Sequence, residues 1–298
     1  MDEREWLAER FEEHRSHLRG VAYRMLGSLT EAEDAVQDAW LRLARADTSG
    51  VENLGGWLTT IVARVCLNML QSRKSRREEP LDTHLPDPII SVEDGAVDPE
   101  QQALLAEGVG LALLVVLDTL APAERVAFVL HDMFAVPFDQ IAPIVGRSPG
   151  ATKMLASRAR RRVQGAAPSP DADLARQRAV VDAFFAAARD GDFAALLAVL
   201  DPDVVIRADV AAVHAGAPTE VHGAAAVTEQ ILTTGGFSRL ARYAHPALVN
   251  GAAGVVLATR GRPISVVAFT VTHGKITEID IFANPTRLRH FNLTVLDD

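Results

Sequence analysis

Apolar residues recur every three or four positions through the first 77 residues, which is the spacing of amphipathic helices. Leu18, Val21 and Met25 keep this spacing in a first helix, and residues 35–43 do so in a second. Ser28 is a candidate N-cap for the second helix. A third helix is predicted from about Leu54 to Leu70. The pattern therefore predicts an all-helical domain over residues 1–77.

A second helical domain is predicted over residues 102–164. A long apolar helix over 104–120 comes first, and Pro122 begins another helix. A short helix over 138–145 is followed by a turn at Gly146 and by a basic helix from Ser148, with Pro149 at its first position. This order is typical of a helix-turn-helix, whose second helix enters the major groove of DNA.

The hydrophobic period changes after residue 172. Two amphipathic helices are predicted over 174–189 and 193–200, and short runs rich in Val and Ile follow them. Helices followed by a mostly antiparallel sheet predict an α+β domain over residues 173–298. The predicted strands are Val204–Ala208, Gly254–Thr259, Ile264–Val271 and Ile276–Phe282.

Two segments between these domains are predicted to be linkers, at residues 78–101 and 165–172. The first holds eight acids, no Lys or Arg and four prolines. The net charge of the chain is −9, which by itself argues against nucleic acid. However, residues 140–164 carry six basic side chains and no acid, and Arg73, Lys74, Arg76 and Arg77 lie together.

Each basic segment allows two interpretations. Basic, polar and aromatic side chains in one helix suit duplex phosphates or unstacked bases. The alternative is a solvated helix end that is favoured by the helix dipole. In the basic helix from Ser148, the side chains expected to be exposed toward DNA are Thr152, Lys153, Ser157, Arg158, Arg160, Arg161 and Arg162.

A single cysteine, Cys66, excludes a disulfide framework and a thiolate metal cluster. The sequence contains no run of 18 apolar residues, so a membrane span is not expected, and residues 1–10 lack the apolar core of a secretory signal. A cytoplasmic protein without a metal site or cofactor is therefore expected.

The residues of the helical domains resemble a known family. Residues 33–43, which read Glu-Asp-Ala-Val-Gln-Asp-Ala-Trp-Leu-Arg-Leu, and residues 57–68 are similar to region 2 of sigma-70 family factors. Residues 117–132 and 138–163 resemble region 4 and its helix-turn-helix. The absence of the intervening regions is typical of the extracytoplasmic-function type. Residues 171–298 resemble a SnoaL-like domain.

This resemblance implies a multi-domain fold. It combines a region 2 helical bundle and a region 4 helix-turn-helix, both all-α, with a C-terminal α+β cone-shaped barrel that is SnoaL-like and nuclear transport factor 2-like. It also implies a function, which is to bind core RNA polymerase and direct promoter-specific transcription initiation. The C-terminal domain would regulate this activity in cis, by an intramolecular contact with the sigma domains or the linker. A separate anti-sigma factor is not required by the sequence.

The resemblance also assigns roles to single residues. The expected contacts to the clamp helices of the largest polymerase subunit are made by Asp34, Gln37, Asp38, Trp40 and Leu41. The −10 element would be bound by Trp57, Arg64, Asn68, Gln71, Arg73 and Arg76. The −35 element would be bound by Ser148, Thr152, Lys153, Ser157, Arg158, Arg160 and Arg161. The acidic linker would either mimic the RNA backbone in the polymerase or act as a solvated spacer.

Two motifs of relatives with the fused domain are altered in this chain. Trp-Leu-Pro-Glu-Pro in the linker reads His-Leu-Pro-Asp-Pro over 84–88, and Asp-Gly-Gly-Gly reads Asp-Val-Ala-Ala over 209–212. The expected C-terminal pocket has Arg207, Asp209, His214 and Tyr243 as candidate polar residues. These residues include no nucleophile–base pair, so an enzyme is not expected. A ligand-gated sigma factor, or a SnoaL-like enzyme with a degenerate helical region, is the alternative.

Overall fold

The computed structural model describes residues 3–46, 51, 53–75, 85–92, 110–166, 170–213, 218–259 and 262–291. The chain divides into two compact units. The N-terminal unit holds residues 1–79, 102–107 and 113–167, and the C-terminal unit holds residues 80–101, 108–112 and 168–298. The two regions predicted as separate helical domains thus belong to one compact unit.

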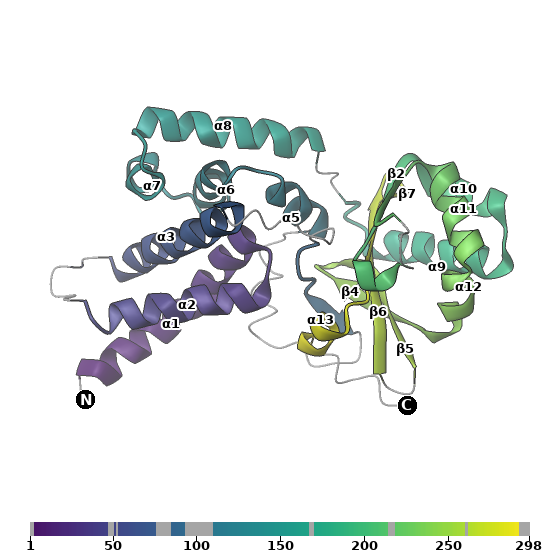
Figure 1. Cartoon of the computed structure of the whole chain (residues 1–298), viewed down its shortest axis with the longest axis horizontal. Coiled ribbons are helices and arrows are strands. Elements are labelled where there is room, and N and C mark those ends of the chain that lie inside the picture. Colours follow the sequence, from purple (N-terminus) through teal and green to yellow (C-terminus); the bar gives the residue numbers. More distant parts are fainter. Residues whose placement is uncertain are drawn as a thin grey trace. The chain divides into compact units, whose positions relative to one another are not determined.

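The N-terminal unit is entirely helical in its described part (Figure 1). The long helices α1, α2 and α3 pack against one another, and α3 also contacts α6 and α7. The helices are α1 Glu3–Leu26, α2 Leu29–Leu43, α3 Leu54–Ser75, α5 Leu111–Asp118, α6 Pro122–Phe128, the π-helix Val129–Met133, α7 Phe138–Val145 and α8 Pro149–Ala166; the first two residues of α5 fall in the C-terminal unit.

The predicted helix boundaries follow from local capping. The side chain of Ser28 accepts a hydrogen bond from Glu31 N at the start of α2, as expected. Gly146 ends α7 with φ +64°, a left-handed conformation that a glycine adopts without strain. Ser148 Oγ then accepts from Ala151 N at 3.3 Å and caps α8. The helix-turn-helix predicted for residues 138–163 is therefore confirmed.

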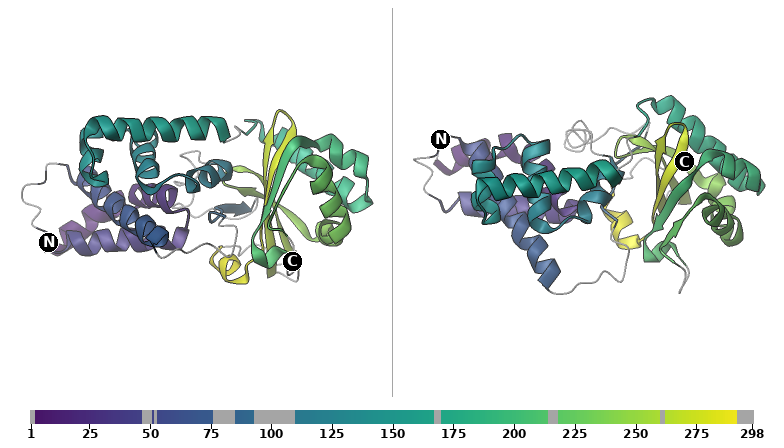
Figure 2. Two further views of the ribbon diagram at one scale, coloured as in Figure 1. Left: turned by 45° about the horizontal axis from the view of Figure 1, so that its top comes forward. Right: turned by 90° about the horizontal axis from the view of Figure 1, so that it is seen from above.

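The C-terminal unit is an α+β fold with a curved, mixed sheet. Helices α9 to α12 cover one face of this sheet (Figures 1 and 2). The helices are α9 Leu174–Asp190, α10 Phe193–Val199, α11 Ala224–Thr234, α12 Gly236–Leu240 and α13 Pro285–His290, with 3₁₀ turns at Val210–Ala212 and Ala241–Tyr243. The strands are β1 Ile90–Val92, β2 Leu200–Ala208, β3 Glu220–His222, β4 Ala244–Val249, β5 Ala252–Thr259, β6 Arg262–Thr272 and β7 Lys275–Phe282.

The strand order is β1-β4-β5-β6-β7-β2-β3, and every neighbouring pair is antiparallel except β2 and β7. All four strands predicted from the sequence are present, so the α+β class is confirmed. The sheet is curved but not closed, because β1 and β3 are its two edges and do not pair with each other in the described part of the chain. The strands β1, β3 and β4 were not predicted, because they are too short to show a clear alternation of apolar and polar residues.

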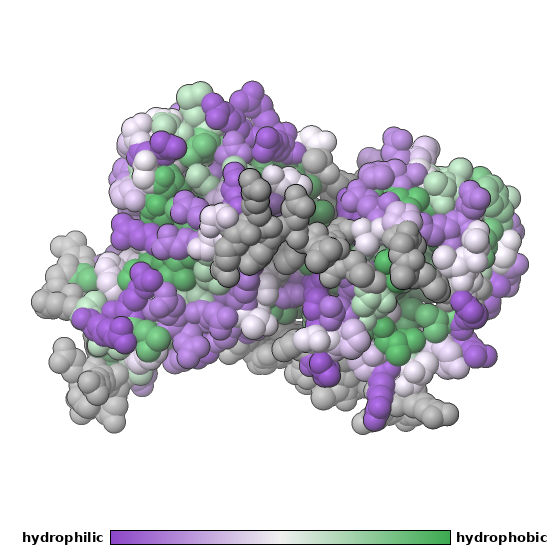
Figure 3. Space-filling model, in the orientation of Figure 1, coloured by the Kyte–Doolittle hydropathy of each residue, from purple (hydrophilic) through white to green (hydrophobic). Residues whose placement is uncertain are grey.

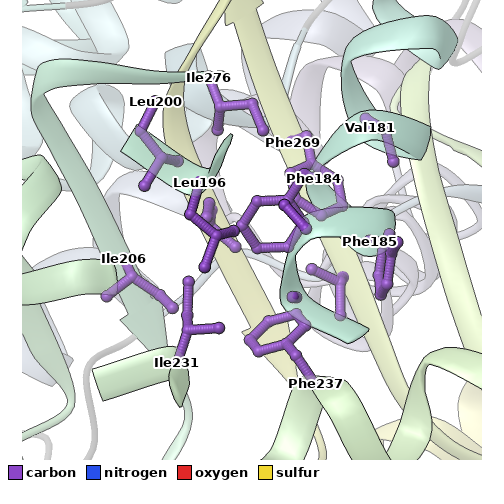
Figure 4. Packing of buried hydrophobic residues seen from close by; sticks show 14 of the residues in the cluster. Val181, Phe184, Phe185, Leu196, Leu200, Ile206, Ile231, Phe237, Phe269 and Ile276 are labelled. Carbon is purple, nitrogen blue, oxygen red and sulfur yellow. The ribbon is translucent and has the colours of Figure 1, made fainter. Parts of the chain in front are cut away.

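The core of the C-terminal unit lies between this sheet and the helices α9 to α12. Phe184 is fully buried, with its ring centroid 5.4 Å from those of Phe237 and Phe269. Figure 4 shows Leu196, Ile206 and Ile231 gathered around these rings. Because side chains alternate along a strand, Ile206 on β2 faces this core and its neighbour Arg207 faces the other side of the sheet.

Candidate nucleic-acid and polymerase interfaces

Helix α8 presents a basic surface. Lys153, Arg158, Arg161 and Arg162 are exposed, and hydrophilic residues gather along this helix (Figure 3). Arg160 pairs with Asp132 at 2.5 Å, and Arg162 with Glu124 at 3.2 Å. Among the described residues, Lys153, Arg158 and Arg161 have no such carboxylate partner, so they suit the phosphates and base edges of a major groove.

Thr152 does not belong to this surface, which corrects the expectation that it is exposed toward DNA. Its side chain is completely buried, and its hydroxyl donates to Ser148 O at 2.9 Å. The physical reason is helical spacing: Thr152 shares a face with Ala156 and Ala159, and both of these are completely buried. Ser157 is half-buried.

Helix α3 carries the residues predicted for the −10 element. Arg64, Asn68 and Gln71 are exposed and lie four and three residues apart, so they form one stripe. Trp57, seven residues before Arg64, is half-buried on the same side of the helix. A planar ring, a cation and two amides along one face suit unstacked bases and their phosphates.

Arg73 is held within the protein instead of projecting from this stripe. Its guanidinium donates to Leu26 O at 3.3 Å and pairs with Glu31. The position is three residues after the buried Leu70, so Arg73 continues the inner face of α3. Arg76 lies outside the described residues.

On helix α2, the candidate polymerase contacts fall into two groups. Asp34, Gln37, Asp38 and Leu41 lie on one face, and the side chain of Leu41 is 45% exposed. Asp38 pairs with Arg42 one turn further along at 2.9 Å. Trp40 points toward α1, where its ring lies 5.2 Å from that of Phe11. An exposed leucine among carboxylates is a suitable centre for a protein contact.

Part of the predicted acidic linker is a structural element of the C-terminal unit. Residues 90–92 pair with β4 as strand β1, with Ile90 opposite Val249. Ile89 N donates to Asn250 Oδ1 at 3.0 Å, and Asn250 N donates to Ile89 O at 2.8 Å. The expectation of a linker over 78–101 is therefore wrong for residues 85–92, which we call the docked segment.

Helix α13 holds the start of the docked segment. Arg287 donates from Nε to Asp87 Oδ1 at 3.0 Å and from Nη2 to Leu85 O at 2.7 Å. Leu85 and Ile89 are almost completely buried. Residues 85–88 of this segment belong to the His-Leu-Pro-Asp-Pro motif noted above, so this described part of the motif is docked on the C-terminal unit.

Asp209 fixes the start of α13. Its carboxylate accepts from Ala283 N and Asn284 N, both at 2.9 Å, and from Ala212 N at 3.1 Å. Asn284 is the N-cap of α13 and accepts from Thr286 N and Arg287 N. Asp209, together with Asn284, thus orients the helix whose Arg287 holds the docked segment.

The C-terminal unit has a cavity of about 290 Å³, and Arg207, Asp209 and Tyr243 are not among the described residues that line it. Arg207 lies on the opposite face of the sheet, where it pairs with Glu278 at 3.1 Å and Asp280 at 3.3 Å. Asp209 is occupied as described above, and Tyr243 stacks with Arg242. His214 lies outside the described residues. The sequence analysis did not distinguish the face of β2 that lines the cavity from the opposite face, on which Arg207 lies.

Two groups are deeply buried. Burial raises the pKa of Asp280 to about 7, although Arg207 lowers it. Burial also raises the pKa of the Cys66 thiol on the inner face of α3. Within the described residues there is no cluster of three or more metal-ligating side chains, and no helix long and apolar enough to cross a membrane.

Comparison with known proteins agrees with this arrangement. The family model "Sigma-70 region 2" matches residues 10–76, and the model "Sigma-70, region 4" matches residues 110–163. The two helical parts of the N-terminal unit are therefore the two DNA- and polymerase-binding regions of a sigma-70 type factor.

Similarity to known proteins extends over most of the chain. The probable ECF RNA polymerase sigma factor SigI of Mycobacterium tuberculosis is 37% identical over 284 residues, which are 92% of both chains. SigJ of the same organism is 39% identical over 293 residues, covering 93% of this chain and 91% of SigJ. The crystal structure of SigJ matches with a TM-score of 0.76 and 36% identity over 96% of this chain and 99% of SigJ. The chain belongs to the extracytoplasmic-function family of RNA polymerase sigma factors.

Proposed function

We propose that the C-terminal unit regulates this sigma factor in cis by holding the docked segment that lies between regions 2 and 4. The observation that carries the proposal is the pairing of β1 with β4, reinforced by Arg287 on Asp87. Regions 2 and 4 are joined only through residues 77–109 in sequence. A domain that binds part of this connection therefore limits how far the two regions separate.

Separation matters because of the geometry of a promoter. Elements centred at −10 and −35 are 25 base pairs apart, or about 85 Å along a B-form duplex at about 34 Å per turn. A compact unit of about 140 residues has a radius of gyration of about 14 Å. The packed N-terminal unit therefore cannot reach both elements, and regions 2 and 4 must part when the factor acts on a promoter.

The energy of docking suits a reversible contact. Burial of Leu85, Ile89 and Ile90 contributes about 5–9 kcal/mol. The four hydrogen bonds from Asn250 and Arg287 described above add about 4 kcal/mol. Ordering eight residues opposes this by about 8–16 kcal/mol, toward the lower end because Pro86 and Pro88 stiffen the segment. The opposing contributions nearly cancel, so polymerase binding can release the segment.

The residues that contact polymerase and promoter follow from the exposed surfaces. The face of α2 with Asp34, Gln37, Asp38 and Leu41 binds the clamp helices of the polymerase. Arg64, Asn68 and Gln71 bind the −10 element together with Trp57. Arg73 binds it only when its ion pair with Glu31 is broken. Lys153, Arg158 and Arg161 bind the −35 element. Ser148 caps the helix that carries them, and Arg160 binds DNA only when its ion pair with Asp132 is broken.

We further propose that the protein acts in the cytoplasm, without a separate anti-sigma factor, and that its C-terminal domain is not an enzyme. The non-catalytic assignment is supported by the separation of the ionisable cluster from the cavity. Arg207, Glu278 and Asp280 lie on one face of the sheet, and the cavity lies on the other. A substrate in the cavity would meet no acid–base pair among the described residues.

The experiment compares two variants of helix α13 in promoter-specific transcription with core polymerase. Arg287→Ala removes the hold on Asp87 and Leu85, and we expect the initiation rate to change several-fold in either direction. Arg289→Ala is the matched control, because Arg289 is exposed and donates to Thr286 on its own helix. Equal rates for both variants and the unaltered chain, with unchanged thermal unfolding, would contradict regulation through the docked segment.

A further inference from the structure

The cavity of the C-terminal unit is largely apolar. Strands β2, β5, β6 and β7 form one wall, and α11 and α12 contribute to another. Its lining includes Ile206, Val221, Ile231, Phe237, Leu257 and Val267. A volume of about 290 Å³ approaches the lower end of small-molecule sites. Apolar cavities that stay dry take up small apolar molecules, because their walls lack contacts on the empty side.

One polar group in this lining lacks a partner. Ser265 is 6% exposed, and its Oγ is buried without a hydrogen-bond partner among the described residues. Ser265 pairs with Leu257 across the sheet and lies on the same face of β6 as Val267, and both of these residues line the cavity. A buried hydroxyl is normally hydrogen-bonded, so this site favours a ligand with a hydrogen-bonding group.

The charge of the lining restricts the ligand further. Among the lining residues in the described part of the chain, Arg239 is the only one with an ionisable side chain. It is exposed, and it donates to Thr234 O at 2.9 Å and Gly235 O at 3.1 Å, where it satisfies the C-terminal end of α11. The described lining therefore offers no counter-charge inside the cavity, and an ionised group would be desolvated against it without compensation.

We propose that this cavity binds a neutral, mainly apolar organic molecule about the size of two fused rings, with one hydrogen-bonding group at Ser265. This inference goes beyond the proposed regulation, because binding is measurable whether or not the docked segment responds. The cavity is also connected to the helix that holds the docked segment. Ala212 and Ala283 line it, and their amides donate to Asp209, which orients α13.

Three probes test the class of ligand by titration of the full chain at pH 7. They are 2-naphthol, which is neutral and carries a hydroxyl; naphthalene, which lacks it; and 2-naphthoate, which is an anion. We expect saturable binding of 2-naphthol, weaker binding of naphthalene by about two- to tenfold, and the weakest binding for 2-naphthoate. Absence of saturable binding for all three, or tightest binding of 2-naphthoate, would overturn the proposal.

Variants locate the site. Ile264→Trp places a large ring at the cavity lining, and we expect at least a tenfold loss of 2-naphthol affinity. Val205→Trp is the matched control, because Val205 is half-buried on strand β2 of the same sheet and is not among the residues that line the cavity. Equal affinities for the two variants would refute the location. Should Ile264→Trp fail to fold by circular dichroism, Val221→Trp provides the same test from β3.

Ser265→Ala tests the polar contact. We expect it to lower the affinity for 2-naphthol to that for naphthalene, and to leave naphthalene binding within about twofold of the unaltered chain. A preserved preference for 2-naphthol in Ser265→Ala would show that the hydroxyl of Ser265 is not the partner, and it would overturn that part of the assignment.

Discussion

Arg125 joins regions 2 and 4 within the N-terminal unit, and replacing it tests how strongly they are packed. Its side chain is 6% exposed. Nη1 donates to Met25 O of α1 at 3.0 Å, and Nη2 donates to Asp118 O at 2.6 Å and pairs with the Asp118 carboxylate at 3.0 Å. Burial lowers the pKa of this guanidinium, and Asp118 opposes that effect. Arg125→Met keeps an apolar stem of similar length and removes only the charged group.

The expected loss follows from these contacts. Removing one partner of a buried ion pair costs about 3–5 kcal/mol, chiefly because it leaves the other partner uncompensated. Asp118 is 29% exposed, so water partly solvates its carboxylate in the variant, and relief of guanidinium desolvation offsets a further part. We expect Arg125→Met to lower the free energy of unfolding of the N-terminal unit by about 2–4 kcal/mol.

Urea unfolding followed by tryptophan fluorescence is a suitable assay, because the three tryptophans all lie within the first 57 residues and report on this unit. The control is Arg158→Met, which removes an exposed guanidinium of α8. A loss below about 0.5 kcal/mol in Arg125→Met, within the range of ordinary surface changes, would refute the view that this residue secures the packing of regions 2 and 4.

Three further outcomes are expected. Arg158→Ala should weaken binding to a −35 duplex by about 1–3 kcal/mol, whereas Arg189→Ala on α9 should not; an unchanged affinity and salt dependence would remove Arg158 from the DNA surface. Leu41→Ala should weaken core polymerase binding, while Phe193→Ala, which removes an equally exposed apolar side chain (45%), should leave it unchanged; equal effects would argue against the α2 surface. The pKa of Asp280 is raised from 3.8 to about 7, so the folded unit holds a proton that the unfolded chain has lost, and its stability should fall as pH rises from about 4 through 7. Asp280→Asn should flatten that fall in thermal unfolding temperature, and an unchanged slope would contradict the raised pKa.

The helical part of the fold could be predicted because its signals are local. The spacing of Leu18, Val21 and Met25, the cap at Ser28 and the turn at Gly146 each act within a few residues. The same holds for the four longer strands. The docked segment could not be predicted, because Ile89 meets Asn250 across 161 positions of sequence. Prolines and acids around it give the composition of a linker, and only the tertiary contact makes it a strand.

The exposure of the candidate site residues could be predicted where residue type and helical phase agree. Arg64 and Asn68 on α3, and Arg158 and Arg161 on α8, are exposed on the faces that the spacing indicates. Thr152 was assigned from its polarity, although its phase placed it beside buried alanines. Arg207 was assigned to a pocket for the same reason. A polar residue in a strand has two possible faces, and only the hydrophobic phase of its neighbours decides between them.

Promoter-specific transcription by core polymerase, with the full chain and with a chain ending after Gly165, tests the central claim most directly. The shorter chain keeps regions 2 and 4 and lacks β4 and α13, which hold the docked segment. We expect both chains to initiate at the same start site and at clearly different rates. Absence of promoter-specific initiation with either chain would contradict the assignment as a sigma factor, and equal rates would contradict regulation by the C-terminal domain.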